Sequence, residues 1–393
     1  MSNGGKSIQG RPGRYIRQPA ASRAFVPAPL PPKPPLALTG QLQELVSEAD
    51  YLLGRLDGAL LTLPNPDLFV FMYVRKEAVL SSQIEGTQSS LQNLLAAEER
   101  LYDPKTPADV AEVINYVRAM NYGFQRLHQL PLSVRLLREI HAELMCGVRG
   151  GQLSPGELRT TQNWLGPAGC TLQEATFVPP PPHELPQALA DLERFLNTKS
   201  GLPPLVEVGL AHAQFETIQP FLDGNGRMGR LLITFLLVKK ALLAKPVLYL
   251  SHYFKQYRAD YYDRLQAVRD QGDWEGWLAF FLRGVAEVAR DASRTAAAIV
   301  RLRETCRARI TEELGRAAAN GHRVLERLFD HPIVAVAHVR EWLGVTPAGA
   351  NQLVKRLERA GILLEVTGYT RNRRFRFEPY LRLFEEPAET EAP

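Results

Sequence analysis

The chain has 393 residues, 45% hydrophobic and 23% charged, a composition typical of a globular protein long enough for two or three domains. Its formal net charge of +5 is mildly basic and does not by itself indicate nucleic-acid binding. Three widely separated cysteines exclude a disulfide framework and a paired-cysteine metal site, so we expect a cytoplasmic protein. We expect no signal peptide, because residues 1–9 are polar, and no membrane span, because the most apolar stretch, 231–250, contains three lysines.

The beginning of the sequence divides into an arm and a helical region. Residues 1–38 are rich in proline, which lacks the N–H that a helix needs, so they predict an extended, Pro-rich arm. Residues 39–130 carry apolar side chains at three- and four-residue spacing, which indicates several helices.

Residues 131–290 are expected to form the central domain. Helical patterns recur on both sides of an irregular segment rich in glycine and proline, at 133–147, 185–198 and 204–217. A short loop then leads into a long apolar helix, expected at about 225–243. Two separate amphipathic helices follow at 253–269 and 274–290.

The C-terminal part of the chain is expected to be a separate small domain at 320–384, joined by a polar linker helix at 291–319. Thr346 followed by Pro347 has the usual pattern of a helix start. A helix, a helix-turn-helix and two strands, ILLEVTG and RRFRFEP, follow one another in the order of a winged helix. Residues 385–393 are acidic and predict a disordered tail.

The strongest chemical signal is the string QPFLDGNGRMGR at 219–230. Gly224 and Gly226 flank Asn225 directly before a helix, and glycine lets the backbone approach a ligand closely. The free N–H groups and the positive dipole end of that helix favour a bound anion. The string therefore predicts a phosphate site.

Three charged side chains in the same string extend this prediction. Arg227 and Arg230 are three residues apart on the first turn, so both are expected to project to one side and to contact a polyphosphate. Asp223 supplies the carboxylate for the Mg²⁺ that accompanies such a ligand.

This string resembles the motif HPFxDGNGRxxR of the Fic (Fido) family, with one departure, and the preceding AHAQFETI resembles the helix that leads into it. The resemblance implies a mainly α fold, with a helical core, a small β-hairpin flap and a C-terminal winged helix-turn-helix domain. It implies ATP and Mg²⁺ as ligands and transfer of AMP to a Ser, Thr or Tyr hydroxyl of a target protein, or of the chain itself. The nucleotide-binding residues it implies are Gly224, Asn225, Gly226, Arg227, Gly229, Arg230 and Tyr262.

Two further segments resemble parts of the same family. The string RTTQNW at 159–164, followed by ATFVPPPP, is similar to the flap region, which holds the target chain by strand addition. The resemblance implies target contacts from Thr176, Phe177 and Val178.

The string SSQIEG, from Ser81 to Gly86, resembles the inhibitory motif [S/T]xxxE[G/N] of family members that carry their inhibitor before the core. In that class the glutamate, here Glu85, pairs with the second motif arginine, here Arg230. A carboxylate on this guanidinium denies it to the γ-phosphate of ATP. The resemblance therefore implies autoinhibition.

Gln219 stands where the family has a histidine that acts as general base. An amide cannot take up a proton near neutral pH, and losing a general base lowers a rate by about 10²- to 10⁴-fold. His212 lies about two helical turns upstream and is expected to be a packed histidine rather than a substitute base. We expect impaired or absent activity. Three explanations stay open: a deliberate replacement of the histidine, a natural nucleotide sensor without transfer, or transfer without a base.

Other functions remain as alternatives. The chain is also compatible with a nucleotide-sensing DNA-binding regulator that uses 320–384, and with removal of AMP on the same scaffold. Basic residues on the third helix and wing support DNA contacts: Lys355, Arg356, Arg359, Arg371, Arg373, Arg374 and Arg376. Glu358 and Glu365 interrupt this basic face, which favours packing on a protein instead. The charged helix at 301–316 is a candidate homodimer contact.

Overall fold

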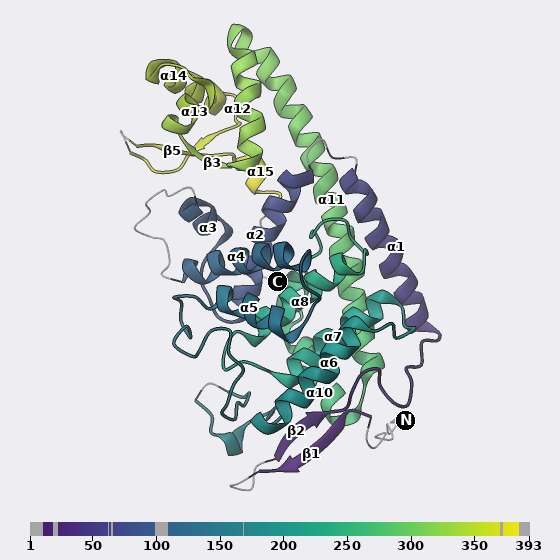
Figure 1. The fold of residues 1–393 in the computed structure, drawn as a ribbon. Coiled ribbons are helices and arrows are strands. Elements are labelled where there is room, and N and C mark those ends of the chain that lie inside the picture. Colours follow the sequence, from purple (N-terminus) through teal and green to yellow (C-terminus); the bar gives the residue numbers. More distant parts are fainter. Residues whose placement is uncertain are drawn as a thin grey trace, which may run out of the picture. The chain divides into compact units, whose positions relative to one another are not determined.

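The computed structural model describes residues 11–18, 23–61, 63, 66–98, 109–167, 169–369 and 372–384. These residues form two compact units. The first comprises the described parts of 1–57, 77–88 and 111–290, and the second those of 58–76, 89–110 and 291–393. Three long helices contribute residues to both units: α1 (Gln41–Leu61), α2 (Pro66–Ile84) and α11 (Trp274–Leu314) (Figure 1).

The core of the first unit is built around two helices, α7 (Pro204–Ile218) and α8 (Asn225–Lys239), which pack against each other. Every residue of α7 from Leu205 onward is buried. Helix α6 (Leu185–Asn197) and helix α10 (Arg258–Gln271) both contact α7. Because α7 is enclosed on all sides, each polar side chain on it must find a partner inside the protein.

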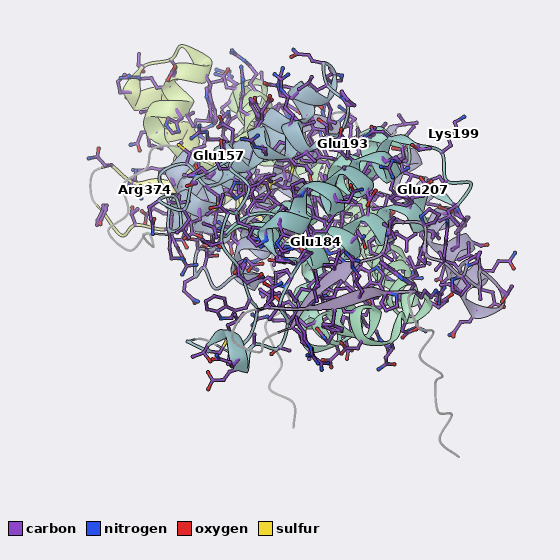
Figure 2. All side chains as sticks on the ribbon, turned by 60° about the horizontal axis from the view of Figure 1, so that its bottom comes forward. Glu157, Glu184, Glu193, Lys199, Glu207 and Arg374 are labelled. Atoms are coloured by element: carbon purple, nitrogen blue, oxygen red, sulfur yellow. The ribbon has the colours of Figure 1, made fainter. Side chains whose placement is uncertain are left out.

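The remaining helices of the first unit are α4 (Val110–Leu127), α5 (Val134–Leu144) and α9 (Ser251–Gln256). Helix α5 begins where the side chain of Ser133 accepts a hydrogen bond from the N–H of Leu136. Glu193 of α6, labelled in Figure 2, accepts a second bond from the N–H of Val134 at 2.7 Å. These two bonds satisfy free N–H groups at the start of α5.

A β-hairpin occupies part of the segment that was expected to be an extended arm. Strands β1 (Gly13–Arg17) and β2 (Arg23–Pro27) pair antiparallel, with Tyr15 opposite Phe25. The prediction was wrong for these residues because proline is absent from both strands except at the last position of β2, so the ladder keeps its donors. The N–H of Phe25 also donates to the carbonyl oxygen of Val178 at 2.8 Å, which ties the hairpin to the core.

Helix α11 also differs from expectation. The sequence pattern predicted an amphipathic helix at 274–290 and a separate linker helix, whereas the structure has a single helix of 41 residues. No glycine or proline occurs between 285 and 314, so nothing in the sequence interrupts the helical hydrogen bonds.

The second unit contains α3 (Leu91–Glu98), α12 (Ala318–Asp330), α13 (Val336–Leu343) and α14 (Pro347–Arg359). It also contains a three-stranded antiparallel sheet of order β3-β5-β4, from Ile333–Ala335, Arg374–Arg376 and Leu364–Glu365, and the short α15 (Glu378–Leu381). Thr346 caps α14 as expected, since its side chain accepts the N–H of Gly349. Strand β3 was not expected, and the predicted acidic tail lies outside the described residues.

Among the described residues, none of the helices combines the length and the apolar character needed to cross a bilayer.

Candidate functional site

A pocket opens in the first unit where α7 passes into α8. Its walls come from the end of α2, the segment 163–165, the loop between α7 and α8, and α10. Most of the residues that the sequence assigned to the site line this pocket: Glu85, Gln219, Asp223, Gly224, Asn225, Gly226, Arg230 and Tyr262. The structure therefore brings Glu85, which follows α2, and the loop between α7 and α8 together, although they lie more than 130 residues apart in the sequence.

Two residues in the left-handed region shape the loop. Gln219 ends α7 with φ 48° and ψ 64°, and Gly224 precedes α8 with φ 75°. Glycine adopts this conformation without strain, whereas glutamine rarely does. The side chain of Asn225 closes the loop, since it accepts the N–H of Phe221 at 2.9 Å and donates to the carbonyl of Phe221 at 2.8 Å. Its amide therefore stabilises the loop.

Asp223 is held in place by neighbouring groups. Its Oδ1 accepts the N–H of Gly224 at 2.6 Å, and its carbonyl oxygen accepts a bond from Nε2 of His141 at 3.0 Å. Nδ1 of His141 accepts the N–H of Gly156, so the hydrogen of the neutral ring is on Nε2. Burial lowers the pKa of His141 to about 4, which keeps the ring neutral. No sequence motif had pointed to His141.

A carboxylate such as that of Asp223 is the ligand type that Mg²⁺ prefers. Among the residues that the structure describes, no group of three or more His, Cys, Asp or Glu side chains is placed to hold a metal ion. A Mg²⁺ at Asp223 would therefore take its other ligands from phosphate and water, which is common for this ion.

Arg230 lies at the centre of the predicted inhibitory contact. Its Nε donates to Oγ of Ser81 at 2.7 Å, and its Nη2 donates to the Ser81 carbonyl at 3.0 Å and to Oε1 of Glu85 at 2.6 Å. The side chain of Arg230 is 2% exposed and that of Glu85 is 33% exposed. Burial alone would lower the pKa of Arg230, but the charges of Glu85, Tyr261 and Glu216 and the hydrogen bond to Glu85 together outweigh burial, and the pKa is raised.

Gly226 is the residue that lets Glu85 come so close to α8. A Cβ atom added at Gly226 would lie 2.3 Å from Oε1 of Glu85 and 3.1 Å from Nη1 of Arg230. The carboxylate of Glu85 therefore lies directly against the first turn of α8, where the helix has N–H groups without intrahelical acceptors. Gly86 follows with φ 98°, after the end of α2.

Arg227 and Gly229 do not line the pocket. Arg227 is buried and its Nη1 donates to Glu112 of α4 at 3.1 Å, so the two motif arginines do not project to one side as expected. Residues three apart on a helix differ in direction by some 60°, which here is enough to send them to different acidic partners. Gly229 faces α7 instead, because a Cβ atom there would lie 2.1 Å from Oε1 of Glu216.

The side chain of Gln219 is buried and turned toward its own helix. Its Nε2 lies 3.1 Å from the carbonyl oxygen of Glu216 and 3.1 Å from Oε2 of the same residue. The carbonyl oxygen of Gln219 accepts a bond from Nε of Arg159 at 2.7 Å, and Nη2 of Arg159 also donates to the carbonyl of Pro180 at 2.5 Å. Arg159 thus joins the loop to the segment that follows the flap.

Two consecutive tyrosines of α10 form another wall of the pocket. Tyr262 is 43% exposed and is available to a ligand. Tyr261 is buried, and its hydroxyl lies 2.9 Å from Nε2 of His212, whose Nδ1 lies 2.9 Å from the carbonyl of Gly229. His212 is thus a packed residue with both ring nitrogens bonded, and burial lowers its pKa to about 3.

The expected flap is less regular than a hairpin. Its strand pairing consists of one bridge, in which Leu165 and Phe177 exchange both backbone hydrogen bonds. Thr176 is exposed, but Phe177 and Val178 are buried, and the carbonyl of Val178 already accepts the N–H of Phe25. The strand at 177–178 is therefore paired on both sides, so an added target strand would have to use another edge.

Comparison with known proteins assigns the chain to a family. Residues 43–125 match the Fic/DOC family N-terminal model, and residues 131–237 match the Fic/DOC family model. The chain therefore carries both domains of the Fic/DOC family, as the motif indicated. The protein adenylyltransferase Fic of Drosophila erecta is 30% identical over 205 residues, which are 50% of this chain and 37% of that protein. Its counterpart in Drosophila yakuba is 29% identical over 250 residues, 61% of this chain and 45% of that protein.

The chain thus spans less than half the length of these curated relatives. Among solved structures, a Fic family protein from Desulfovibrio desulfuricans G20 superposes with a TM-score of 0.56 at 21% identity, covering 87% of this chain and 97% of that one. A Fic domain containing signaling protein from Bacteroides thetaiotaomicron VPI-5482 gives a TM-score of 0.53 at 19% identity, covering 64% and 97%. At these identities the likeness shows the fold, which is the mainly helical Fic fold.

Proposed function

We propose that the chain binds ATP with Mg²⁺ in the pocket at the start of α8 and transfers AMP to a hydroxyl of a protein. The observation that carries this proposal is the buried guanidinium of Arg230 beside the first turn of α8, paired in the pocket with Glu85. A positive charge next to a helix N-terminus is suited to a phosphate chain. The curated relatives, which are named protein adenylyltransferases, support the same reaction.

Different walls of the pocket suit different parts of the nucleotide. The backbone at Gly224, Asn225 and Gly226 faces the phosphates, and Tyr262 offers an exposed ring for the base. Asp223 would hold Mg²⁺, whose role is to offset the negative charge of the phosphates. Gly229 and Arg227 would act indirectly, since they shape the packing behind the pocket.

Glu85 would act as an inhibitor by occupying the guanidinium of Arg230. Because the carboxylate of Glu85 also lies against Gly226, it fills space at the start of α8 as well as neutralising charge. A γ-phosphate directed to Arg230 would have to displace it. Autoinhibition thus follows from both charge and volume.

In the transfer step, the target hydroxyl oxygen bonds to the α-phosphorus while the bond from that phosphorus to the β-phosphate oxygen breaks and pyrophosphate leaves. The hydroxyl proton must go to an acceptor near residue 219. Because Gln219 offers an amide there, we propose that the chain as written transfers AMP slowly or not at all.

The test is label transfer from ATP carrying the label on its α-phosphate. Gln219→His and Glu85→Gly would be compared singly and together with the parent chain. We expect a gain of about 10²-fold or more from the histidine in the Glu85→Gly background. Glu184→Gly is the matched control, because it removes a carboxylate that pairs with Arg14 and does not line the pocket.

No label transfer in the double variant, with intact ATP binding, would contradict the transferase function. Loss of label from a previously modified protein on incubation with the parent chain would instead indicate removal of AMP. Both outcomes are read in the same assay.

A second candidate is DNA binding by the winged helix that we propose for 320–384. Lys355 and Arg359 are exposed on α14, and Tyr369, on the expected wing, is 54% exposed. Arg356 is engaged elsewhere, since it donates to the carbonyl of Leu314, and Arg371 lies outside the described residues. A gel shift at two salt concentrations tests this candidate. Salt-sensitive binding lost in Lys355→Ala/Arg359→Ala supports it, and no shift at low salt refutes it.

A further inference from the structure

Glu216 is a buried carboxyl group in the wall of the pocket that no motif identifies. It lies on α7 three residues before Gln219, so the two side chains share a face at the end of the helix. Its side chain is nine-tenths or more buried, and its Oε1 has no hydrogen-bond partner among the described residues. An unpartnered buried carboxyl oxygen is costly, and it often marks a functional group.

The contacts of Glu216 fix the orientation of the Gln219 amide. The backbone carbonyl of Glu216 can only accept a hydrogen bond, so the atom of Gln219 that faces it must be the nitrogen. Oε2 of Glu216 lies at 3.1 Å from the same nitrogen. An amide nitrogen carries two hydrogens, and these two acceptors can take both. The nitrogen is thereby engaged, and the carbonyl oxygen is the part of the amide that remains for a ligand of the pocket that Gln219 lines.

An amide held in this way presents an acceptor where a neutral histidine would present a ring nitrogen. A target hydroxyl can donate a hydrogen bond to Oε1 of Gln219, so the hydroxyl proton already points at this oxygen before the reaction. The amide oxygen alone cannot keep that proton near neutral pH. A group behind the amide has to receive it, and Glu216 is in direct contact with the amide nitrogen.

We propose that Glu216 is the proton acceptor for transfer in this chain, with the amide of Gln219 as the bridge between the target hydroxyl and the carboxylate. This inference rests on the proposed function, because it assigns a residue role within that reaction. It would give the chain a route for slow transfer without a histidine.

The hydroxyl oxygen bonds to the α-phosphorus and pyrophosphate leaves, while the hydroxyl hydrogen passes to Oε1 of Gln219. One hydrogen of Nε2 passes at the same time to Oε2 of Glu216, which leaves Gln219 as the imidic acid. The amide is restored when Glu216 returns a proton to Nε2 and the Oε1 hydrogen is released to water.

The groups around Glu216 bring the pKa of its carboxyl group close to neutral pH, where a base is useful. Burial raises its pKa to about 7; the charge of Arg230 lowers it, that of Glu85 raises it, and Arg269 of α10 lowers it. Nη2 of Arg269 also donates to the Glu216 carbonyl at 3.1 Å, and Tyr261 faces the same cluster. A base is most effective when its pKa is near the working pH. Removing Glu85 is expected to lower the pKa of Glu216 and so to increase its ionised fraction.

A double-mutant cycle on the full chain tests the proposal. Glu216→Gln would be combined with the Glu85→Gly variant, once with Gln219 and once with Gln219→His. With Gln219, we expect residual label transfer that Glu216→Gln lowers by about 10²-fold. With the histidine, which takes the proton itself, we expect a loss of less than about threefold from the same change, as for a residue outside the chemistry.

Each other outcome overturns the proposal in its own way. Equal losses in both backgrounds would mean that Glu216 only supports the fold. No loss, or no transfer at all with Gln219 while the histidine variant is active, would remove Glu216 from the chemistry. An inactive histidine variant would refute the transferase function itself, and with it this inference.

Two further readouts do not depend on the size of the activity. The transfer rate of Glu85→Gly should rise with pH through the pKa of Glu216 and then level off. This rise should be absent when Glu216→Gln is added. The infrared band of a protonated carboxyl group should also titrate in this range in the parent chain and weaken in Glu216→Gln. Glu77→Gln is the matched control for the band, because burial raises the pKa of Glu77 to about 7 as well.

Discussion

Oε1 of Glu85 lies 2.6 Å from Nη2 of Arg230, and the same arginine is held by the hydroxyl and the carbonyl of Ser81. Ser81 of α2 and Glu85, directly after α2, therefore engage the Nε and Nη2 donors of one buried guanidinium. The carboxylate is the partly exposed member of the pair, so it is the member that can leave.

Glu85→Gly is expected to raise the affinity for Mg²⁺ and ATP. A hydrogen bond between charged groups contributes about 1.5–3 kcal/mol, so its removal from the unbound state should raise affinity by roughly 10- to 100-fold. Calorimetric titration measures this directly. Arg230→Ala should abolish the gain, and equal affinities for the parent and Glu85→Gly chains would contradict the inhibitory role.

Gly226→Ala tests the volume that Glu85 occupies. The added methyl group would lie 2.3 Å from Oε1 of Glu85, so we expect a loss of about 1–3 kcal/mol in the free energy of unfolding, partly offset by the better helix propensity of alanine. In the Glu85→Gly background this contact is absent and only the 3.1 Å approach to Nη1 of Arg230 remains, so the loss should be much smaller. Urea unfolding of the four chains gives the comparison. A loss that is the same in both backgrounds would show that Glu85 is not the obstacle.

The part of the site that the sequence could predict is the part formed by short motifs. The contact of Glu85 with Arg230 was expected because both belong to strings with fixed spacing, and the turn at Gly224 follows from glycine's conformational freedom. His141 carried no such signal, because its partners are backbone atoms of Asp223 and Gly156 that only the tertiary fold brings near. Glu216 was missed because its burial beside Arg230 and Arg269 also depends on the tertiary fold. Arg227 was misjudged for the same reason: its direction depends on Glu112, which lies 115 residues away.

The same distinction holds for the fold. Most helices followed from apolar spacing, and the cap at Thr346 from its Ser/Thr-Pro pattern. The hairpin of β1 and β2 was missed because the prolines around it dominated the composition of the arm. The break placed between 290 and 291 came from a change in polarity along α11, and polarity does not end a helix when no residue there breaks its hydrogen bonds.

Arg159→Ala is expected to loosen the flap from the loop between α7 and α8. Arg159 is 3% exposed and donates to the carbonyl oxygens of Gln219 and Pro180. Leaving these buried acceptors without donors should lower the free energy of unfolding by about 2–4 kcal/mol, and Arg159→Lys should recover only part of it because lysine lacks the fork. Arg138→Ala, which removes an arginine whose side chain is 41% exposed, is the control and should change stability by less than about 1 kcal/mol. Faster proteolysis within 165–178 in Arg159→Ala alone would locate the effect at the flap, and equal stability of the two variants would contradict it.

Glu77→Gln should change how stability depends on pH. Glu77 is buried on α2, two turns before Glu85, and accepts bonds from the hydroxyls of Ser251 at 2.6 Å and Tyr116 at 3.0 Å. Burial raises its pKa from 4.5 to about 7, so between these values the folded chain binds a proton that the unfolded chain has released. The resulting stabilisation is fully present below about pH 4.5 and is lost as the pH rises through about 7, by an amount on the order of 3 kcal/mol.

Glutamine stays neutral at every pH. The free energy of unfolding of Glu77→Gln, minus that of the parent chain, should therefore be larger at pH 8 than at pH 5. Denaturant unfolding of both chains at the two pH values gives this difference, and Glu304→Gln, at an exposed position of α11, should show little change at either. Glu216 carries a similar shift, so some pH dependence should survive in Glu77→Gln and should fall again when Glu216→Gln is added. Parallel curves for the parent and Glu77→Gln would show that Glu77 is ionised in the folded chain at pH 5, and because Glu77 interacts electrostatically with Arg230, its charge would then have to be counted among the groups that hold this arginine.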